Sequence, residues 1–383
     1  MKRLLFMDLS VYWSVPMKKT IPIFWPSYHG KDIQRELGRL FPANMSNRWL
    51  GQAHKVDEFE KEFGKKFGYK YCVSVNSGSA ALELAYHLVG IGQDDEVIVT
   101  VLTCTATTVH LVRHGAKIIF ADIKEDLTID PEDVARKITK KTKAIVAVTL
   151  GGIPVDKRIF ALGKKHKIPV IVDCAQSVGA VNEPGDYLCY SFQAIKHFTT
   201  GDGGMLVVRN KKEDRRARLL RWFGIDREKK IKANWKPYQK RHMTMDIEEP
   251  GYKFQMNDIA ATLGLVGLAN SDRYLKHRQA IADYYRANLQ YPTISGGTDW
   301  IFGILVDDRD RIADQLERAG IETNMVHLRN DIFKPFGGKR WRLPMMNRLE
   351  PLYLYIPIHT NMTVKDAKYI TTILNKIRSG HLS

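Results

Sequence analysis

Short apolar segments alternate with helical patterns between residues 70 and 210, and this alternation restricts the possible fold more than any other feature. Strand-like runs occupy 97–99, 117–121, 142–149, 170–172, 187–192 and 204–208. Helical patterns, such as the one at 159–167, separate several of them. Strands that alternate with helices form a mostly parallel sheet with helices on both faces. The sequence therefore predicts an α/β domain whose ligands bind beyond the carboxyl ends of the strands.

An acidic residue and a lysine stand close to the ends of two of these runs. Asp173 ends the run Val-Ile-Val, and Lys196 lies in a loop rich in glycine and hydroxylated residues. A lysine amine can hold an aldehyde cofactor covalently, and a buried carboxylate can keep a pyridine nitrogen protonated. The pair therefore indicates pyridoxal 5'-phosphate (PLP) chemistry. A lone lysine in so basic a chain is far more often a solvated surface lysine, but the small, hydroxylated and glycine-rich residues on both sides of Lys196 favour a crowded cofactor site.

A third segment offers an anion site. Ser77-Gly78-Ser79 follows a short apolar run and precedes a helical pattern that ends near Tyr86. The unpaired N–H groups and the dipole of a helix N-terminus favour a phosphate. By itself the tripeptide could be an ordinary helix cap. Together with Asp173 and Lys196, it supplies the phosphate contact that PLP requires.

The second half of the chain is predicted to be mainly helical. The stretch 226–250 is polar and weakly periodic and is expected to form a loop. Helical patterns follow at 256–267, 274–289, 309–318 and 364–378, and a smaller domain is expected to begin near Asn270.

These segments resemble the sugar aminotransferases named after DegT and StrS, which are PLP enzymes of fold type I. The resemblance begins near Ile21, extends to the C-terminus and includes further segments at 48–52, 56–60, 92–99, 129–133, 138–145 and 251–261. It implies a large α/β domain over 31–268 with a mostly parallel seven-stranded sheet sandwiched by helices. An N-terminal extension at 1–30 and a smaller C-terminal α+β domain at 269–383 complete the expected organisation.

The resemblance also implies roles for single residues. Lys196 is the covalent anchor and the general acid and base, Asp173 is the partner of the ring nitrogen, and Gln176 lies near the ring hydroxyl. The remaining implied cofactor contacts are Ser77, Gly78, Ser79, Cys104, Ser191 and, from the neighbouring subunit of a homodimer, Gln255. The implied substrate residues are Trp49 and Gln52 at the entrance, and His327 and Arg329 near the sugar. No metal site is implied.

The implied reaction moves an amino group from L-glutamate to a nucleotide-linked keto-sugar, with pyridoxamine 5'-phosphate formed in the half-reaction. The product would be an amino-sugar for a surface polysaccharide or glycoconjugate. Two departures from the family pattern stand out. Cys104 occupies a position where an aromatic residue usually stacks on the cofactor ring. Lys253-Phe-Gln255 replaces the usual Asn-Tyr-Arg.

Composition limits the remaining possibilities. The chain of 383 residues carries a formal net charge of +17, but no recognisable nucleic-acid-binding module accompanies it. A positive field could instead steer a dianionic nucleotide-sugar towards its site. No apolar run is long enough to span a membrane. Because Cys72, Cys104, Cys174 and Cys189 lie in apolar or small-residue stretches without metal spacing, we expect buried reduced thiols and a cytoplasmic protein.

Two other functions remain open at this point. Related PLP enzymes remove a hydroxyl group from the sugar, and they carry a histidine at the lysine position. Lys196 argues against that dehydratase chemistry, although His197 follows it directly. The other possibility is a catalytically silent PLP-binding protein that acts through interactions.

Overall fold

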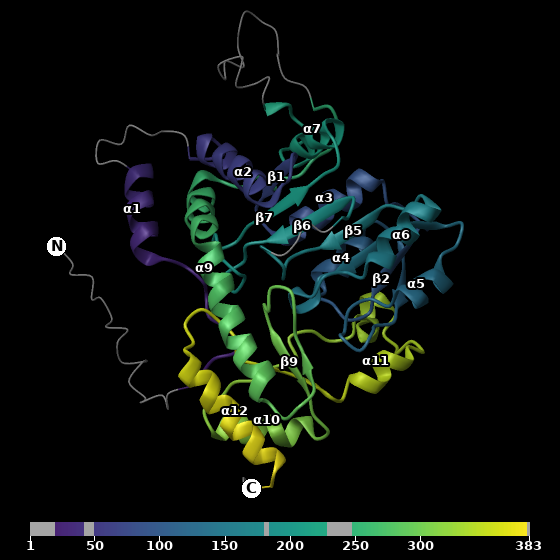
Figure 1. The fold of residues 1–383 in the computed structure, drawn as a ribbon. Coiled ribbons are helices and arrows are strands. Elements are labelled where there is room, and N and C mark those ends of the chain that lie inside the picture. The colour runs from purple at the N-terminus through teal and green to yellow at the C-terminus, as the bar shows by residue number, and fades with distance from the viewer. Residues whose placement is uncertain (1–19, 42–49, 180–183, 228–246, 381–383) are drawn as a thin grey trace, which may run out of the picture.

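One seven-stranded sheet organises the larger part of the protein (Figure 1). The computed structural model describes residues 20–41, 50–179, 184–227 and 247–380. The strand order is β1-β7-β6-β5-β4-β2-β3. Only β7 runs antiparallel to its neighbours, and all the other pairs are parallel. The strands are β1 (Cys72–Val75), β2 (Glu96–Thr100), β3 (Lys117–Ala121), β4 (Thr142–Val148), β5 (Val170–Asp173), β6 (Tyr187–Ser191) and β7 (Gly204–Val207).

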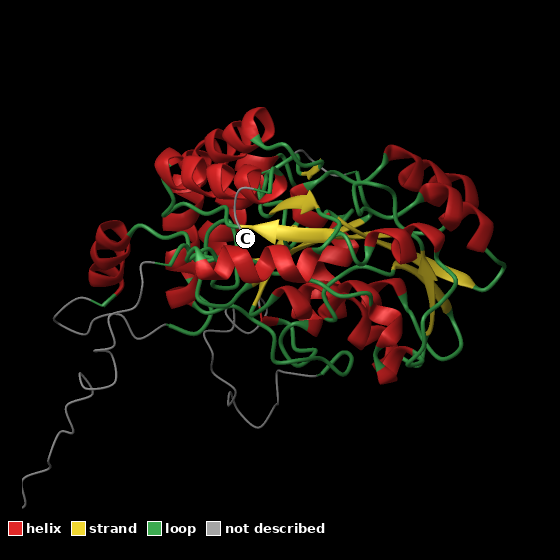
Figure 2. Cartoon of the chain, turned by 90° about the horizontal axis from the view of Figure 1, so that it is seen from below, coloured by secondary structure: helices red, strands yellow, loops and turns green. Residues whose placement is uncertain are grey.

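Helices cover both faces of this sheet, as the view along its edge shows (Figure 2). The helices on one face are α2 (His54–Phe67), α5 (Pro131–Lys137), α6 (Lys157–His166) and the first part of α9 (Asp258–Asn288). Those on the other face are α3 (Gly78–Val89), α4 (Ala106–Arg113) and α7 (Lys211–Leu220). Successive β4 residues, such as Ile145 and Val146, enter the two cores in turn. Burial on both faces explains why these strands are continuous apolar runs.

A smaller unit follows, with its own three-stranded antiparallel sheet in the order β10-β9-β8. Its strands are β8 (Thr293–Ile294), β9 (Phe302–Leu305) and β10 (Tyr353–Ile356), and its helices are α10 (Arg309–Arg318), α11 (Pro344–Leu349) and α12 (Val364–Arg378). The N-terminal segment joins this unit, because Ile21 pairs with Ile321. The segment then leads into α1 (Gly30–Leu40), which packs on α9. The predicted α/β fold with a smaller α+β part is confirmed.

Helix α9 corrects the expected break near Asn270. The structure has one helix of 31 residues where the sequence predicted two. The polar residues at the expected break bond within the helix: Asn270 Nδ2 donates to the Val266 carbonyl at 2.9 Å, and Ser271 Oγ donates to the Leu268 carbonyl at 2.8 Å. Such local bonds let polar residues remain in a helix. The predicted domain boundary at 268/269 therefore falls inside α9, and the division into domains stays a prediction.

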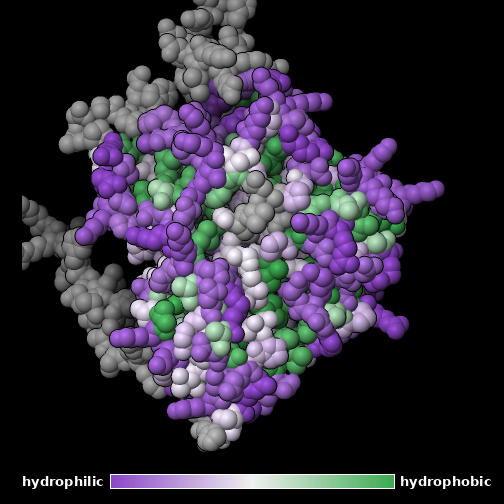
Figure 3. All heavy atoms as spheres, viewed as in Figure 1, coloured by the Kyte–Doolittle hydropathy of each residue, from purple (hydrophilic) through white to green (hydrophobic). Residues whose placement is uncertain are grey.

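The molecular surface is largely hydrophilic on the face shown in Figure 3. Within the described residues, none of the helices combines the length and apolar character that crossing a membrane requires.

Candidate active site

Asp173 lies at the carboxyl end of β5 and is almost completely buried. Its Oδ2 accepts a hydrogen bond from Thr107 Oγ1 at 2.8 Å, and its Oδ1 accepts one from the Ala175 N–H at 3.0 Å. Thr103 Oγ1 lies 2.8 Å from Thr107 Oγ1 and donates to it, because the Thr107 proton is directed to the carboxylate. Burial raises the pKa of Asp173, while the Thr107 bond and the charge of Lys196 oppose that rise. A cation beside this carboxylate would stabilise its charged form.

Lys196 lies in the loop between β6 and β7, and its amine is directed into the protein. Its Nζ is 4.0 Å from the centre of the Trp300 ring. Burial lowers the pKa of Lys196 to about 8, although the charge of Asp173 acts in the opposite direction. A lysine with this pKa exchanges its proton readily near neutral pH, as a general acid and base must.

The predicted phosphate turn lies at the N-terminus of α3. Ser77 caps the helix, because its Oγ accepts the Ala80 N–H at 3.1 Å. A Cβ atom on Gly78 would lie 2.8 Å from Cβ of Ser191. A Cβ atom on Gly204 would lie 2.4 Å from the Ser77 carbonyl oxygen. Two glycines thus allow the turn to approach the ends of β6 and β7, with the half-buried Ser79 in the first turn of α3.

Gln176 and His327 form a second polar contact close to Lys196. Gln176 Oε1 accepts the Gly151 N–H at 2.6 Å, and its Nε2 lies 2.6 Å from His327 Nε2. Since the amide oxygen already accepts a bond, the amide nitrogen is the donor towards the histidine. Burial, together with the charge of Lys196, lowers the pKa of His327 to about 3. His327 is therefore neutral, and its Nε2 is an acceptor.

Arg329 does not join this group, and its role as a substrate residue stays a prediction that its contacts do not support. Its side chain is fully buried and forms an ion pair with Asp331 at 2.6 Å. Further bonds join it to the Asn347 side chain and to the Trp341 carbonyl. A guanidinium whose donors are used inside the protein has none to offer a sugar.

The other predicted residues have different positions. The expectation that all four cysteines are buried is wrong for Cys104, which is exposed. Cys104 lies after the carboxyl end of β2. It is close enough to Lys196 to interact electrostatically. Gln52 precedes α2, where its carbonyl accepts a bond from Arg227. The backbone of Gln255 pairs with Val75 of the same chain, beside the phosphate turn. Trp49 lies outside the described residues.

Two residues that contact Asp173 or Lys196 were not predicted from the sequence, namely Thr107 and Trp300. Thr107 lies in the first turn of α4, shortly after the carboxyl end of β2, and this position near a strand end was a usable signal. Trp300 gave no such signal, because 105 residues separate it from Ile195, the residue whose carbonyl it contacts.

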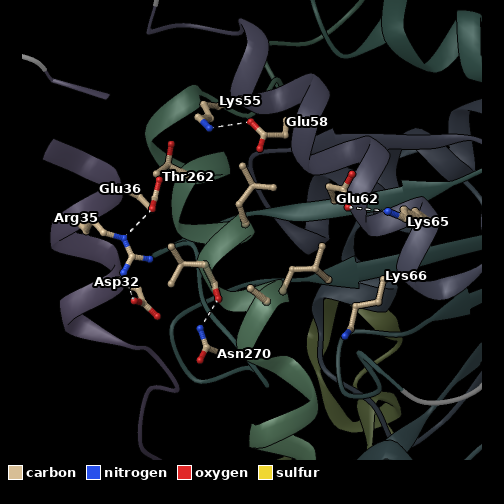
Figure 4. A pocket seen from close by; sticks show the side chains of 14 residues that line it. Asp32, Arg35, Glu36, Lys55, Glu58, Glu62, Lys65, Lys66, Thr262 and Asn270 are labelled. Atoms are coloured by element: carbon tan, nitrogen blue, oxygen red, sulfur yellow. Dashed lines mark hydrogen bonds and ion pairs between the residues drawn. The ribbon is translucent and has the colours of Figure 1, made fainter. Parts of the chain in front are cut away.

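A separate cleft of about 620 Å³ lies between α1, α2 and α9 (Figure 4). None of the predicted site residues lines that cleft, and its charged side chains pair locally, for example Lys55 with Glu58.

A model of the DegT/DnrJ/EryC1/StrS aminotransferase family matches residues 31–375. The chain belongs to this family. The family resemblance predicted from the sequence is therefore confirmed, and the protein is an aminotransferase.

Individual relatives agree with this assignment. The chain is 32% identical to the spore coat polysaccharide biosynthesis protein SpsC of Bacillus subtilis, over 88% of this chain and 92% of that protein. It is 31% identical to a UDP-4-amino-4,6-dideoxy-N-acetyl-beta-L-altrosamine transaminase of Campylobacter jejuni, over 92% and 98% of the two chains. The "putative sugar aminotransferase Spr1654" of Streptococcus pneumoniae, solved in a PLP form, superimposes with a TM-score of 0.81 at 25% identity, over 94% of this chain and 99% of that chain.

The contact between Gly78 and Ser191 yields a first test. Gly78→Ala would force a Cβ atom against Cβ of Ser191, and overpacking of this kind costs about 1–3 kcal/mol. We expect PLP binding, followed by absorbance titration, to weaken by about tenfold or more. Gly92→Ala is the matched control, because no heavy atom lies within 4 Å of its added Cβ. Equal PLP affinity in the Gly78→Ala variant and the wild type would contradict this placement of the phosphate turn.

Proposed function

We propose that this aminotransferase transfers an amino group from L-glutamate to a keto-sugar linked to a nucleotide. The observation that carries the proposal is the juxtaposition of the half-buried Lys196 and the buried Asp173 carboxylate, in the same part of the fold as a helix N-terminus. The names of the relatives support the substrate class, since one is a transaminase of a UDP-linked amino-sugar. SpsC supports a role in making an amino-sugar for a surface polysaccharide or glycoconjugate.

The residues present fit PLP as the cofactor. The turn at the N-terminus of α3 suits a phosphate group, because neither Gly78 in the turn nor Gly204 of the adjacent β7 carries a Cβ atom. Asp173 would hold the ring nitrogen, Gln176 would face the ring hydroxyl, and Lys196 would hold the aldehyde carbon. The remaining proposed contacts are Ser77, Ser79, Ser191 and Cys104. When bound, PLP supplies an aldehyde that takes up the amino group and a protonated ring that draws electrons from the breaking bond.

The chain itself contributes proton transfer and a fixed charge. Lys196 Nζ, with a pKa of about 8, takes the proton from the substrate carbon in its neutral form and returns it as an ammonium. The Asp173 carboxylate, fixed by Thr107 and Ala175, would favour a protonated ring nitrogen when PLP is bound. His327 remains neutral beside Gln176, so that it orients the amide without adding a second positive charge.

The alternative functions receive less support. A dehydratase of this type would carry a histidine in place of Lys196. The neighbouring His197 is buried in the protein interior, where desolvation holds its pKa well below the usual range. A silent interaction protein would not need a lysine whose pKa is lowered towards neutrality. We also propose a cytoplasmic location, because three of the four free cysteines are buried thiols.

The substrate proposal is tested with a panel of keto-sugars linked to UDP, GDP and dTDP. We expect purified protein with PLP and glutamate to convert at least one of them to an amino-sugar with release of 2-oxoglutarate. Lys196→Ala should abolish turnover, because it removes the only group assigned to proton transfer at the substrate carbon. Loss of a sugar hydroxyl without 2-oxoglutarate formation would identify a dehydratase instead, and full activity in Lys196→Ala would refute the assignment.

We propose further that the protein is a homodimer with Gln255 at the interface, close to the partner's phosphate site. Three apolar side chains that precede or follow Gln255 in the sequence are exposed, namely Phe223, Ile247 and Ile259. Phe223 and Ile247 lie in the segments 222–225 and 247–253, which pair with each other, and Ile259 is the second residue of α9. A contact between Gln255 and a phosphate would come from the amide nitrogen, because the amide oxygen is an acceptor.

Light scattering tests the dimer. Ile259→Asp places a charge in the proposed interface, and we expect it to yield monomers with weaker PLP binding. Val364→Asp is the control, since Val364 is also exposed but lies on α12 in the smaller unit. A wild-type protein that is monomeric and fully active would contradict the proposal, as would an Ile259→Asp variant that remains dimeric.

A further inference from the structure

Trp300 contacts the Lys196 loop at two points. Its indole face lies 4.0 Å from Lys196 Nζ, measured to the ring centre. Its Nε1 donates a hydrogen bond to the carbonyl of Ile195, at 3.1 Å. One nearly fully buried side chain therefore holds both the lysine amine and the peptide that precedes the lysine.

Trp300 is itself fixed from three directions. Its backbone N–H donates to the Gly151 carbonyl at 2.9 Å, and its carbonyl accepts a bond from Arg278 of α9 at 3.0 Å. Its ring stacks on Phe24, with ring centres 5.4 Å apart and an interplanar angle of 26°. Gly151 also donates its N–H to Gln176, so that the same turn orients two residues of the proposed site.

Phe24 belongs to an N-terminal segment that is held against the smaller unit. The Ile21 N–H donates to the Gly320 carbonyl at 2.8 Å, and the Ile23 N–H donates to Glu322 at 3.1 Å. The Pro22 carbonyl lies 3.1 Å from Nε2 of His359. These bonds keep Phe24 behind the indole and limit the movement of Trp300.

We infer that Trp300, supported by Phe24, is a positioning residue that holds the Lys196 amine and stabilises its ammonium form whenever the amine is not joined to the cofactor. A cation over an indole face is attracted by the negative face of the ring, and the attraction is strongest away from water. The inference rests on the proposed function of Lys196. It adds that the smaller unit and the N-terminal segment control the position and charge of that lysine.

The indole has two opposing effects on the pKa of Lys196: its ring face attracts the ammonium, and its bulk excludes the water that would also stabilise the charge. Substitutions of Trp300 separate these two effects. Trp300→Leu removes the aromatic face but keeps the surroundings apolar, so that the ammonium loses a favourable contact and the pKa of Lys196 should fall. Trp300→Ala also admits water, which would stabilise the ammonium and raise the pKa. Trp300→Phe retains a weaker aromatic face and should give an intermediate result.

The test measures the pKa of Lys196 in PLP-free protein, from the pH dependence of its modification by an amine-reactive reagent with peptide mapping. Starting from about 8, we expect Trp300→Leu to lower this pKa by about 0.5 units or more, and Trp300→Phe by less. Phe24→Leu should shift it in the same direction. Trp341→Leu is the control, because Trp341 has its own lysine contact, with Lys137.

An unchanged pKa in both Trp300→Leu and Trp300→Phe, with only a lower melting temperature, would overturn the inference and leave Trp300 as a packing residue. If Trp300→Leu does not fold, the Phe variant decides alone. The measurement needs neither cofactor nor sugar. A failed substrate panel therefore does not affect it, and a failed pKa shift does not affect the transferase proposal.

Discussion

The buried Asp173 carboxylate and the half-buried Lys196 lie at the carboxyl end of the central sheet, and the site depends on the loss of water around both groups. Burial pushes both pKa values towards the uncharged forms, while the two charges oppose this effect. The hydrogen bonds that Thr107 and Ala175 donate stabilise the ionised form of Asp173. The parallel topology creates this arrangement, because strand ends and helix N-termini meet at the same edge of the sheet.

The smaller unit contributes to the site as well as enclosing it. Trp300 and His327 both come from the chain after α9 and contact Lys196 and Gln176. Asn330 connects this region to the large sheet, since its amide accepts a bond from Thr108 at 2.6 Å and donates one to the Thr103 carbonyl at 2.7 Å. Asn330 therefore links the His327 segment to Thr103, whose hydroxyl contacts the Thr107 hydroxyl beside Asp173.

Most of the large sheet could be predicted because its parallel strands are buried on both faces and are continuous apolar runs. Asp173 could be found because it ends such a strand, and Lys196 and the Ser77 turn could be found because each follows one. The remaining features depend on tertiary contacts. The sequence around Asn270 is typical of a helix end, but the Asn270 side chain bonds within α9. The ion pair of Arg329 with Asp331 is a contact that the sequence pattern did not indicate. The exposure of Cys104 and the approach of Trp300 to Lys196 depend on chain segments that lie far apart in the sequence.

The charge on Asp173 is the central claim, and Asp173→Asn tests it most directly, because the amide keeps the size of the side chain and removes its charge. Turnover and PLP affinity would be measured together, with Asp186→Asn as the control, since Asp186 accepts the Val170 N–H at the opposite end of β5. We expect PLP still to bind while turnover falls by about 100-fold or more, the loss expected when a strong electrostatic contact is removed. A turnover rate close to that of the wild type in Asp173→Asn would contradict the account.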